Sequence, residues 1–264
     1  MEREAPKRTF EPRLGSPASG VIITGGASGI GLASAQALAA VGRSVALWDL
    51  KAAEAKRRAQ EITAEFGVIA LGLGVDVRDP AALRDSAAAT RATLPSIGAI
   101  AHCAGTVDTG SLEGITPENW AAGMDVHLRA IVLLLQAFLE DLRRQPGSAV
   151  VAIASINATL GNAVNPIYSA AKGGVLSLVR SLADRLARDR IRINSLSPGQ
   201  IVTPMMQPAL DALPGFFEKR ILLGRIGLAE EIGRVVRFLL SDEASYITAA
   251  EVIVDGGNIS SQRT

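Results

Sequence analysis

A tyrosine and a lysine four residues apart, Tyr168 and Lys172, are the residues of this chain best suited to acid/base chemistry. The pattern around them predicts a helix over 166–188, so both side chains share one helix face. A tyrosine hydroxyl ordinarily has a pKa of about 10, and a nearby ammonium group is expected to lower that pKa. Ser155 lies thirteen residues before Tyr168, just past a predicted strand. The three side chains could therefore move a proton at one substrate oxygen.

A glycine-rich segment near the N-terminus predicts a phosphate site. It reads Thr24-Gly25-Gly26-Ala27-Ser28-Gly29-Ile30-Gly31, between a predicted strand and a predicted helix. Glycines allow a tight turn, and the N–H groups at the start of a helix hold negative charge. The candidate contacts are Gly25, Ser28, Gly29, Ile30 and Gly31. The spacing is not the common G-x-G-x-x-G, so a plain strand-to-helix turn is the alternative for this segment alone.

Two aspartates end the next two predicted strands. Asp49 lies 18 residues past Gly31, where a carboxylate can accept hydrogen bonds from an adenosine ribose and repel a 2′-phosphate. This position predicts NAD as the cofactor, with NADP less favoured. Asp76, with Val77 beside it, lies at the end of the third predicted strand, where it could contact the amino group of an adenine. For each aspartate the alternative is a helix cap.

Strands and helices alternate along the chain. Apolar runs predict strands at 21–23, 44–48, 68–75, 99–102, 149–154, 191–196 and 251–254. Periodic segments predict helices at 31–41, 51–66, 80–94, 117–144, 166–188 and 230–240. This alternation predicts an α/β fold with a parallel sheet covered by helices on both faces. No interior linker divides the chain, so we expect a flexible N-terminal arm over 1–19 and one catalytic domain over 20–264.

Composition narrows the classes of function. The 264 residues are 48% hydrophobic and carry a formal net charge of +1, which gives little support to nucleic-acid binding. The apolar run at 130–139 is too short to span a bilayer, and the N-terminal residues lack an apolar signal-peptide core. We therefore expect a cytoplasmic protein that does not enter a membrane. Cys103 is the single cysteine, so an internal disulfide is excluded.

With these motifs in order, the chain resembles the short-chain dehydrogenase/reductase family from about residue 20 to about residue 258. The glycine turn matches T-G-x-x-x-G-I-G, and Tyr168 to Lys172 matches Y-x-x-x-K with Ser155 before it. Ser197-Pro198-Gly199 with Thr203, and Val254-Asp255-Gly256-Gly257, complete the match. The resemblance implies a single-domain Rossmann-type, doubly wound sheet of about seven strands. It also implies hydride transfer between NAD(H) and a secondary alcohol or ketone, with Tyr168 as general acid/base.

The resemblance assigns further roles. Lys172 binds the nicotinamide ribose, and the backbone of Ala104 and Gly105 approaches the cofactor. By the same resemblance, Pro198 and Gly199 form a wall under the nicotinamide. The Ile201 backbone and Thr203 contact its carboxamide. The segment 204–223 covers the substrate, although a helix pair at a subunit interface is a comparable reading of it. The helices at 117–144 and 166–188 assemble a homotetramer or homodimer.

Two histidines depart from the family pattern. His102-Cys103-Ala104-Gly105 stands where N-N-A-G is usual, and His102 is expected to steady the sheet only partly. His127 stands where many members carry a catalytic asparagine that helps hold a water beside the lysine. It either supports a modified proton relay, where a charge on it would oppose Lys172, or is a packed helix histidine. No third ligand accompanies His102 and His127, so no metal site is expected.

Two other functions remain open at this level. One is an NADPH-dependent 3-oxoacyl-thioester reductase, for which Arg43 or Lys51 could meet a 2′-phosphate. The other is a nucleotide-binding protein with little catalysis, suggested by His127. The complete set of Ser155, Tyr168 and Lys172 favours an enzyme.

Overall fold

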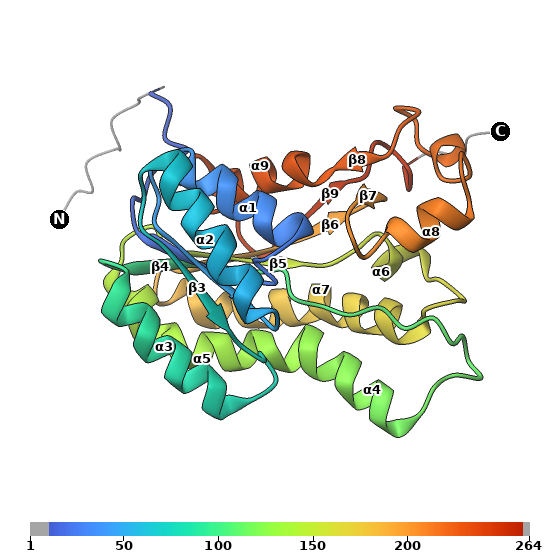
Figure 1. Ribbon diagram of the computed structural model, residues 1–264, viewed down its shortest axis with the longest axis horizontal. Coiled ribbons are helices and arrows are strands. Elements are labelled where there is room, and N and C mark those ends of the chain that lie inside the picture. The colour runs from blue at the N-terminus through green and yellow to red at the C-terminus, as the bar shows by residue number, and fades with distance from the viewer. Residues whose placement is uncertain (1–10, 261–264) are drawn as a thin grey trace.

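The computed structural model describes residues 11–260, and within them seven strands form one parallel sheet in the order β3-β2-β1-β4-β5-β6-β9 (Figure 1). The sheet strands are β1 Gly20–Thr24, β2 Val45–Asp49, β3 Ala70–Gly74, β4 Ile97–His102, β5 Ala149–Ile153, β6 Arg192–Pro198 and β9 Glu251–Val254. The short strands β7 Ile201–Val202 and β8 Gly227–Leu228 pair separately. The predicted α/β fold with a parallel sheet is confirmed.

Helices cover both faces of the sheet (Figure 1). On one face lie α1 Gly29–Ala39, α2 Ala52–Phe66 and α9 Ala229–Leu239, and on the other α3 Pro80–Thr93, α5 Ala130–Arg144 and α7 Pro166–Ala187. Side chains of β1 alternate between the two cores, with Ile22 in one and Val21 and Ile23 in the other. Smaller helices are α4 Pro117–Met124, α6 Asn157–Leu160, α8 Gln207–Ala212 and the 3₁₀ turns Glu218–Arg220 and Asp242–Ala244.

The helix predicted over 117–144 is continuous but irregular. A π-helical turn, Asp125–Arg129, joins α4 to α5 and contains His127. By length and composition alone, Pro117–Arg144 could cross a membrane. Its side chains Ile131, Leu134 and Phe138 are nevertheless buried against the sheet, and a core helix satisfies the same length and composition test.

The strand order places a crevice between β1 and β4. From β1 the chain builds β2 and β3 on one side and then returns to β4 on the other, so neighbouring loops diverge at the carboxyl edge. Gly25, just after β1, has a φ of 65°, and a Cβ on it would lie 3.0 Å from the Cα of Ala104. The backbones that follow β1 and β4 therefore meet closely at this edge.

The described part of the expected N-terminal arm is not free. Arg13 forms an ion pair with Asp242 at 2.7 Å, and the N–H of Asp242 donates to the carbonyl of Ser16 at 2.6 Å. The Ser16 hydroxyl also donates to Asp242 at 2.6 Å. These bonds hold Arg13 and Ser16 against the 3₁₀ turn Asp242–Ala244, which follows α9. Residues 1–10 of that arm lie outside the described residues.

Candidate active site

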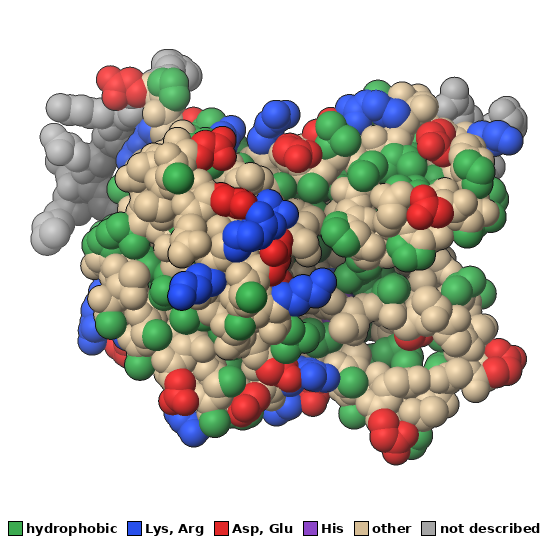
Figure 2. All heavy atoms as spheres, in the orientation of Figure 1, with side chains coloured by type: hydrophobic (Ala, Val, Ile, Leu, Met, Phe, Trp, Pro, Cys, Tyr) green, Lys and Arg blue, Asp and Glu red, His purple; other side chains and the backbone are tan. Residues whose placement is uncertain are grey.

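Two adjoining cavities open at the carboxyl edge of the sheet. The larger has a volume of about 250 Å³ and the smaller about 180 Å³. Both are lined by Gly25, Asp49, Ala104 and Gly105. The larger is also lined by Ser28, Gly29, Ile30, Gly31, His127, Tyr168, Lys172 and Thr203, and the smaller by Asp76 and Val77. Figure 2 shows this face hollowed near its middle, with acidic and basic side chains interspersed around it.

The glycine turn is folded tightly enough to exclude side chains. A Cβ on Gly31 would lie 2.1 Å from the carbonyl oxygen of Gly25, which is closer than any real contact. Ser28, the N-cap of α1, makes no side-chain cap hydrogen bond. The first N–H groups of α1 therefore face the larger cavity without a side-chain partner from Ser28. This arrangement fits the phosphates of a dinucleotide.

Neither Asp49 nor Asp76 is a helix N-cap, because the N-caps of α2 and α3 are Lys51 and Asp79. The Asp49 carboxylate accepts hydrogen bonds from the N–H groups of Ala27 at 3.1 Å and Lys51 at 3.0 Å. It is thereby held at the junction of the two cavities. This position suits an adenosine ribose.

Asp76 has a basic partner that the sequence did not indicate. The Arg78 guanidinium donates to its two oxygens at 2.7–3.2 Å, and these bonds lower the pKa of Asp76. Arg78 also lines the smaller cavity. Arg43, by contrast, is fully buried and donates to the carbonyls of Ser19 and Leu240, so it does not face either cavity. Arg43, one of the two basic residues expected to meet a 2′-phosphate, is therefore not placed to do so, and Arg78 was not expected at the site.

Tyr168 and Lys172 both line the larger cavity, but their electrostatics differ from the expectation. The Lys172 ammonium donates to the carbonyl of Ile153 at 2.6 Å and lies 5.5 Å from the centre of the Tyr168 ring. Burial lowers the pKa of Lys172 to about 8. Burial also raises the pKa of Tyr168, and a hydrogen bond with Ser155 offsets part of that rise. The expected lowering of the tyrosine pKa by Lys172 is not among these effects.

His127 is buried and neutral. Its Nε2 lies 2.9 Å from the carbonyl oxygen of Thr106, which can only accept, and 3.4 Å from the Thr106 nitrogen, whose N–H could donate to it. The shorter contact favours the tautomer with the ring proton on Nε2. Its Nδ1 is then an acceptor, and no described residue donates to it. The ring meets Tyr168 edge-on, with centroids 5.5 Å apart. Burial, followed by the charge of Lys172, lowers the pKa of His127 to about 2, which favours the neutral imidazole near neutral pH.

His102 completes a hydrogen-bond chain across the sheet. Its Nε2 donates to the carbonyl of Val126 at 3.0 Å, and its Nδ1 accepts from the Thr24 hydroxyl at 2.9 Å. The same hydroxyl oxygen accepts from the N–H groups of Cys103 and Ala104, each at 3.2 Å. Both ring nitrogens of His102 are therefore hydrogen-bonded, and they link the ends of β1 and β4 to the π-helical turn. Burial raises the pKa of the Cys103 thiol to about 12, which opposes a nucleophilic role.

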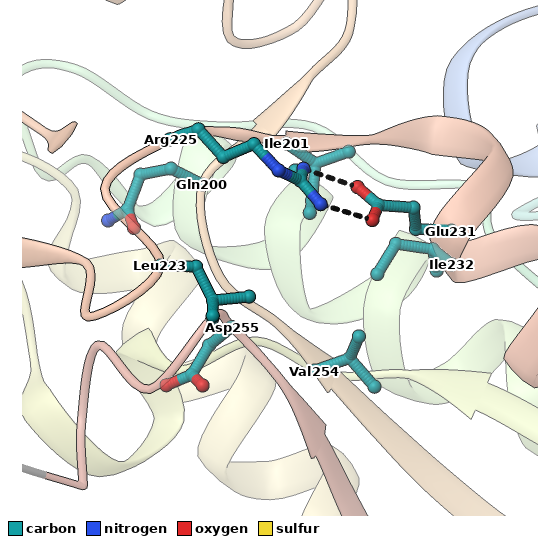
Figure 3. Close-up of a pocket in the computed structure, with 10 residues that line it drawn as sticks. Gln200, Ile201, Leu223, Arg225, Glu231, Ile232, Val254 and Asp255 are labelled. Atoms are coloured by element: carbon teal, nitrogen blue, oxygen red, sulfur yellow. Dashed lines mark hydrogen bonds and ion pairs between the residues drawn. The ribbon is translucent and has the colours of Figure 1, made fainter.

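Several predicted residues lie outside the lining of the two cavities. Pro198 ends β6 at the same sheet edge, followed by Gly199, and Ser155 contacts Tyr168, but none of the three lines either cavity. Ile201 lines a separate pocket of about 90 Å³. Figure 3 shows this pocket beside the ion pair of Arg225 and Glu231, whose bonds are 2.7 and 2.8 Å long.

The expected substrate cover begins at the larger cavity. Pro204 and Met205 line it, whereas Leu213 and Phe216 are exposed farther along. Among residues 11–260, no group of three or more His, Cys, Asp or Glu side chains is placed to hold a metal ion.

Comparisons with known proteins agree with this geometry. A family model described as Enoyl-(Acyl carrier protein) reductase matches residues 25–258. The chain is 33% identical over 240 residues to the probable galactose dehydrogenase GalD of Rhizobium meliloti (strain 1021), covering 90% of this chain and 94% of the relative. It is 31% identical over 236 residues to 3-oxoacyl-(acyl-carrier-protein) reductase FabG of Escherichia coli (strain K12), covering 89% and 95%. The structure of L-sorbose reductase from Gluconobacter frateurii, complexed with NADPH and L-sorbose, matches with a TM-score of 0.87 and 26% identity, covering 92% and 97%.

Proposed function

The chain belongs to the short-chain dehydrogenase/reductase family of NAD(P)-dependent oxidoreductases, and from that premise we propose that it transfers a hydride between NAD(H) and a secondary alcohol or ketone, with Tyr168 as general acid/base. One observation carries the proposal. Tyr168 and Lys172 line the same cavity as the glycine turn, so an acid/base pair and a phosphate cradle face one space. This convergence supports catalysis at the end of a bound dinucleotide.

We assign each residue a role according to where it lies in the two cavities. The glycine turn holds the phosphates, Asp49 the adenosine ribose and Lys172 the nicotinamide ribose, and the bound nicotinamide supplies or accepts the hydride. In reduction, the Tyr168 hydroxyl donates its proton to the carbonyl oxygen and becomes a phenolate, and in oxidation the phenolate form takes the proton from the alcohol. Its raised pKa keeps the phenol protonated, which is the form that donates. Ser155 hydrogen-bonds Tyr168, and in this proposal it also hydrogen-bonds the substrate oxygen and orients it.

A substrate screen tests the activity. Alcohols, sugars, steroids and acyl thioesters are offered with NAD(H) and NADP(H), and the absorbance of reduced nicotinamide is followed. Turnover confined to 3-oxoacyl thioesters with NADPH would support the thioester reductase, a reaction that the FabG relative performs by name. Cofactor binding without turnover across the panel would support a nucleotide-binding protein with little catalysis.

The preference for NAD is proposed on the position of Asp49. We expect higher kcat/KM with NAD than with NADP, and we expect Asp49→Ala to reduce that ratio by at least about tenfold, equivalent to about 1.4 kcal/mol. The reason is that a carboxylate at the cavity junction favours ribose hydroxyls and repels a 2′-phosphate. Steady-state kinetics with both cofactors measure the ratio. A wild-type preference for NADP would refute the proposal. That outcome is a real alternative, because the L-sorbose reductase structure holds NADPH. Glu65→Ala, on the exposed face of α2, should leave the ratio unchanged.

His127 is proposed to support the proton path as a neutral side chain. We expect His127→Phe to lower kcat by about 10- to 100-fold, because it keeps a ring against Tyr168 but removes the bond to Thr106 and the Nδ1 acceptor. His127→Asn should stay within about tenfold of wild type, since an amide can replace the donor. Because the pKa of His127 is about 2, neither variant should remove a limb of the pH profile between pH 5 and 9. An unchanged kcat in His127→Phe would leave His127 as a packing residue.

Assembly and substrate cover are part of the same proposal. A homodimer or homotetramer would form through α5 and α7, where Leu133, Leu178 and Leu182 remain partly exposed. The segment 204–223 would close over an apolar part of the substrate, since its first residues line the larger cavity.

A further inference from the structure

The helix that carries Tyr168 and Lys172 is capped by a residue from another part of the chain. Its own N-cap, Asn165, makes no side-chain cap hydrogen bond. Asp108, in the loop between β4 and α4, accepts instead from the N–H of Tyr168 at 2.8 Å and from the N–H of Ile167 at 3.2 Å. One carboxylate thus satisfies two of the free donors in the first turn of α7, and its charge is favourable at that end of the helix dipole.

The segment containing Asp108, here called the 106–111 strap, is anchored on both sides of Tyr168. At its start, the Thr106 carbonyl accepts from Nε2 of His127. At its end, the N–H of Ser111 donates to the carbonyl of Val164 at 3.1 Å. A cavity of about 140 Å³ lies between the strap and α7 and is lined by Asp108, His127 and Tyr168 among others. Around this cavity, the Asp108 carboxylate is the side chain that bonds the first turn of α7 to the strap.

We infer that Asp108 is a positioning residue, which holds the first turn of α7 so that the Tyr168 hydroxyl meets the substrate oxygen. The inference rests on the acid/base role proposed for Tyr168. Lys172 lies one turn farther along and is held separately by the carbonyl of Ile153. Loss of the Asp108 cap would therefore displace Tyr168 relative to Lys172 instead of moving both together.

Substitutions at Asp108 test the inference. We expect Asp108→Ala to lower kcat by about 10- to 100-fold, because a displacement of about 1 Å in a reacting group has an effect of this size. The Kd for the cofactor should stay within about threefold, since Asp108 does not line the two cofactor cavities. Asp108→Asn keeps one acceptor oxygen and should recover part of the lost kcat, leaving a deficit of about three- to tenfold. Stopped-flow or steady-state kinetics and cofactor titration provide these values.

Asp79→Ala is the matched control. Asp79 caps α3 by accepting from the N–H of Ala81 at 2.8 Å, so its loss removes a comparable cap away from Tyr168. It should lower the melting temperature and leave kcat unchanged. An equal loss of kcat in Asp79→Ala and Asp108→Ala would overturn the inference, because the effect would then be one of general stability.

A double variant separates this inference from the proposed function. With Tyr168→Phe already present, Asp108→Ala should cause no further loss of kcat, because the hydroxyl it positions is absent. A further tenfold loss in the double variant would refute the positioning role. Wild-type kcat in Tyr168→Phe alone would instead refute the acid/base proposal. If Asp108→Ala does not fold, Asp108→Asn decides, and wild-type kcat in that variant would contradict the expected three- to tenfold deficit and refute the positioning role.

Discussion

Replacing Tyr168 by phenylalanine is expected to lower kcat by at least about a thousandfold, within the range attributed to a general acid/base. The change removes one hydroxyl and keeps the ring between His127 and Lys172. Since the phenol hydrogen-bonds Ser155 and has a raised pKa, its proton is held at the cavity and is available to a carbonyl oxygen. The measurement is steady-state turnover with the best substrate from the screen.

The same variant should otherwise resemble the wild type. Loss of one hydrogen bond costs about 1 kcal/mol of unfolding free energy. In a chain of this length, that corresponds to a fall in melting temperature of about 2–4 °C. Cofactor affinity should be nearly unchanged, which a titration of nicotinamide fluorescence would establish. If kcat stays within tenfold of wild type while the variant is folded and binds cofactor, Tyr168 is not the acid/base.

Replacing Gly31 by alanine is expected to raise the cofactor Kd by at least about a hundredfold, or about 2.7 kcal/mol of binding free energy. The added Cβ would lie 2.1 Å from the carbonyl oxygen of Gly25 and 2.7 Å from its carbonyl carbon. Gly25 has little room to move away, because even a Cβ on it would lie 3.0 Å from the Cα and the nitrogen of Ala104. The turn must therefore open, and the N–H groups that start α1 lose their arrangement.

Gly67→Ala provides the comparison for this prediction. Gly67 ends α2 with a φ of 69°, and no atom lies within 4 Å of the position of an added Cβ. Its replacement costs backbone strain of about 1 kcal/mol, because Cβ crowds the following carbonyl oxygen in the left-handed conformation, and it does not alter the glycine turn. Gly67→Ala should therefore lower the melting temperature and keep the cofactor Kd. Retention of the wild-type Kd by Gly31→Ala would show that the glycine turn does not bind the dinucleotide.

The sequence was sufficient for the order of the main elements, because the signals that predict them are local. The seven strands and six long helices were placed from apolar runs and helical periodicity, and the strand predicted at 251–254 matches β9 in both bounds. The pairing of Tyr168 with Lys172 also follows from local geometry, since four residues on a helix return to the same face. The glycine spacing likewise determined where a turn could approach a phosphate.

The directions of the pKa shifts and the bonding partners of the site residues depended on tertiary structure. Burial raises the pKa of Tyr168 and keeps His127 neutral, and burial is a property of the packed protein that residue spacing does not contain. Nothing local in the sequence predicts that Arg43 is buried and bonded to Ser19, or that Arg78 forms an ion pair with Asp76.

Asp108 shows the same limit most clearly. It lies sixty residues before Tyr168, in a loop without a regular pattern, so nothing local indicates that it caps α7. The sequence by itself determined which residues could move a proton and which turn could hold a phosphate, because both properties arise from spacing along a helix or a turn. Only the tertiary structure decided how those residues are charged, held and aligned, because charge state and alignment depend on desolvation and on contacts between distant segments.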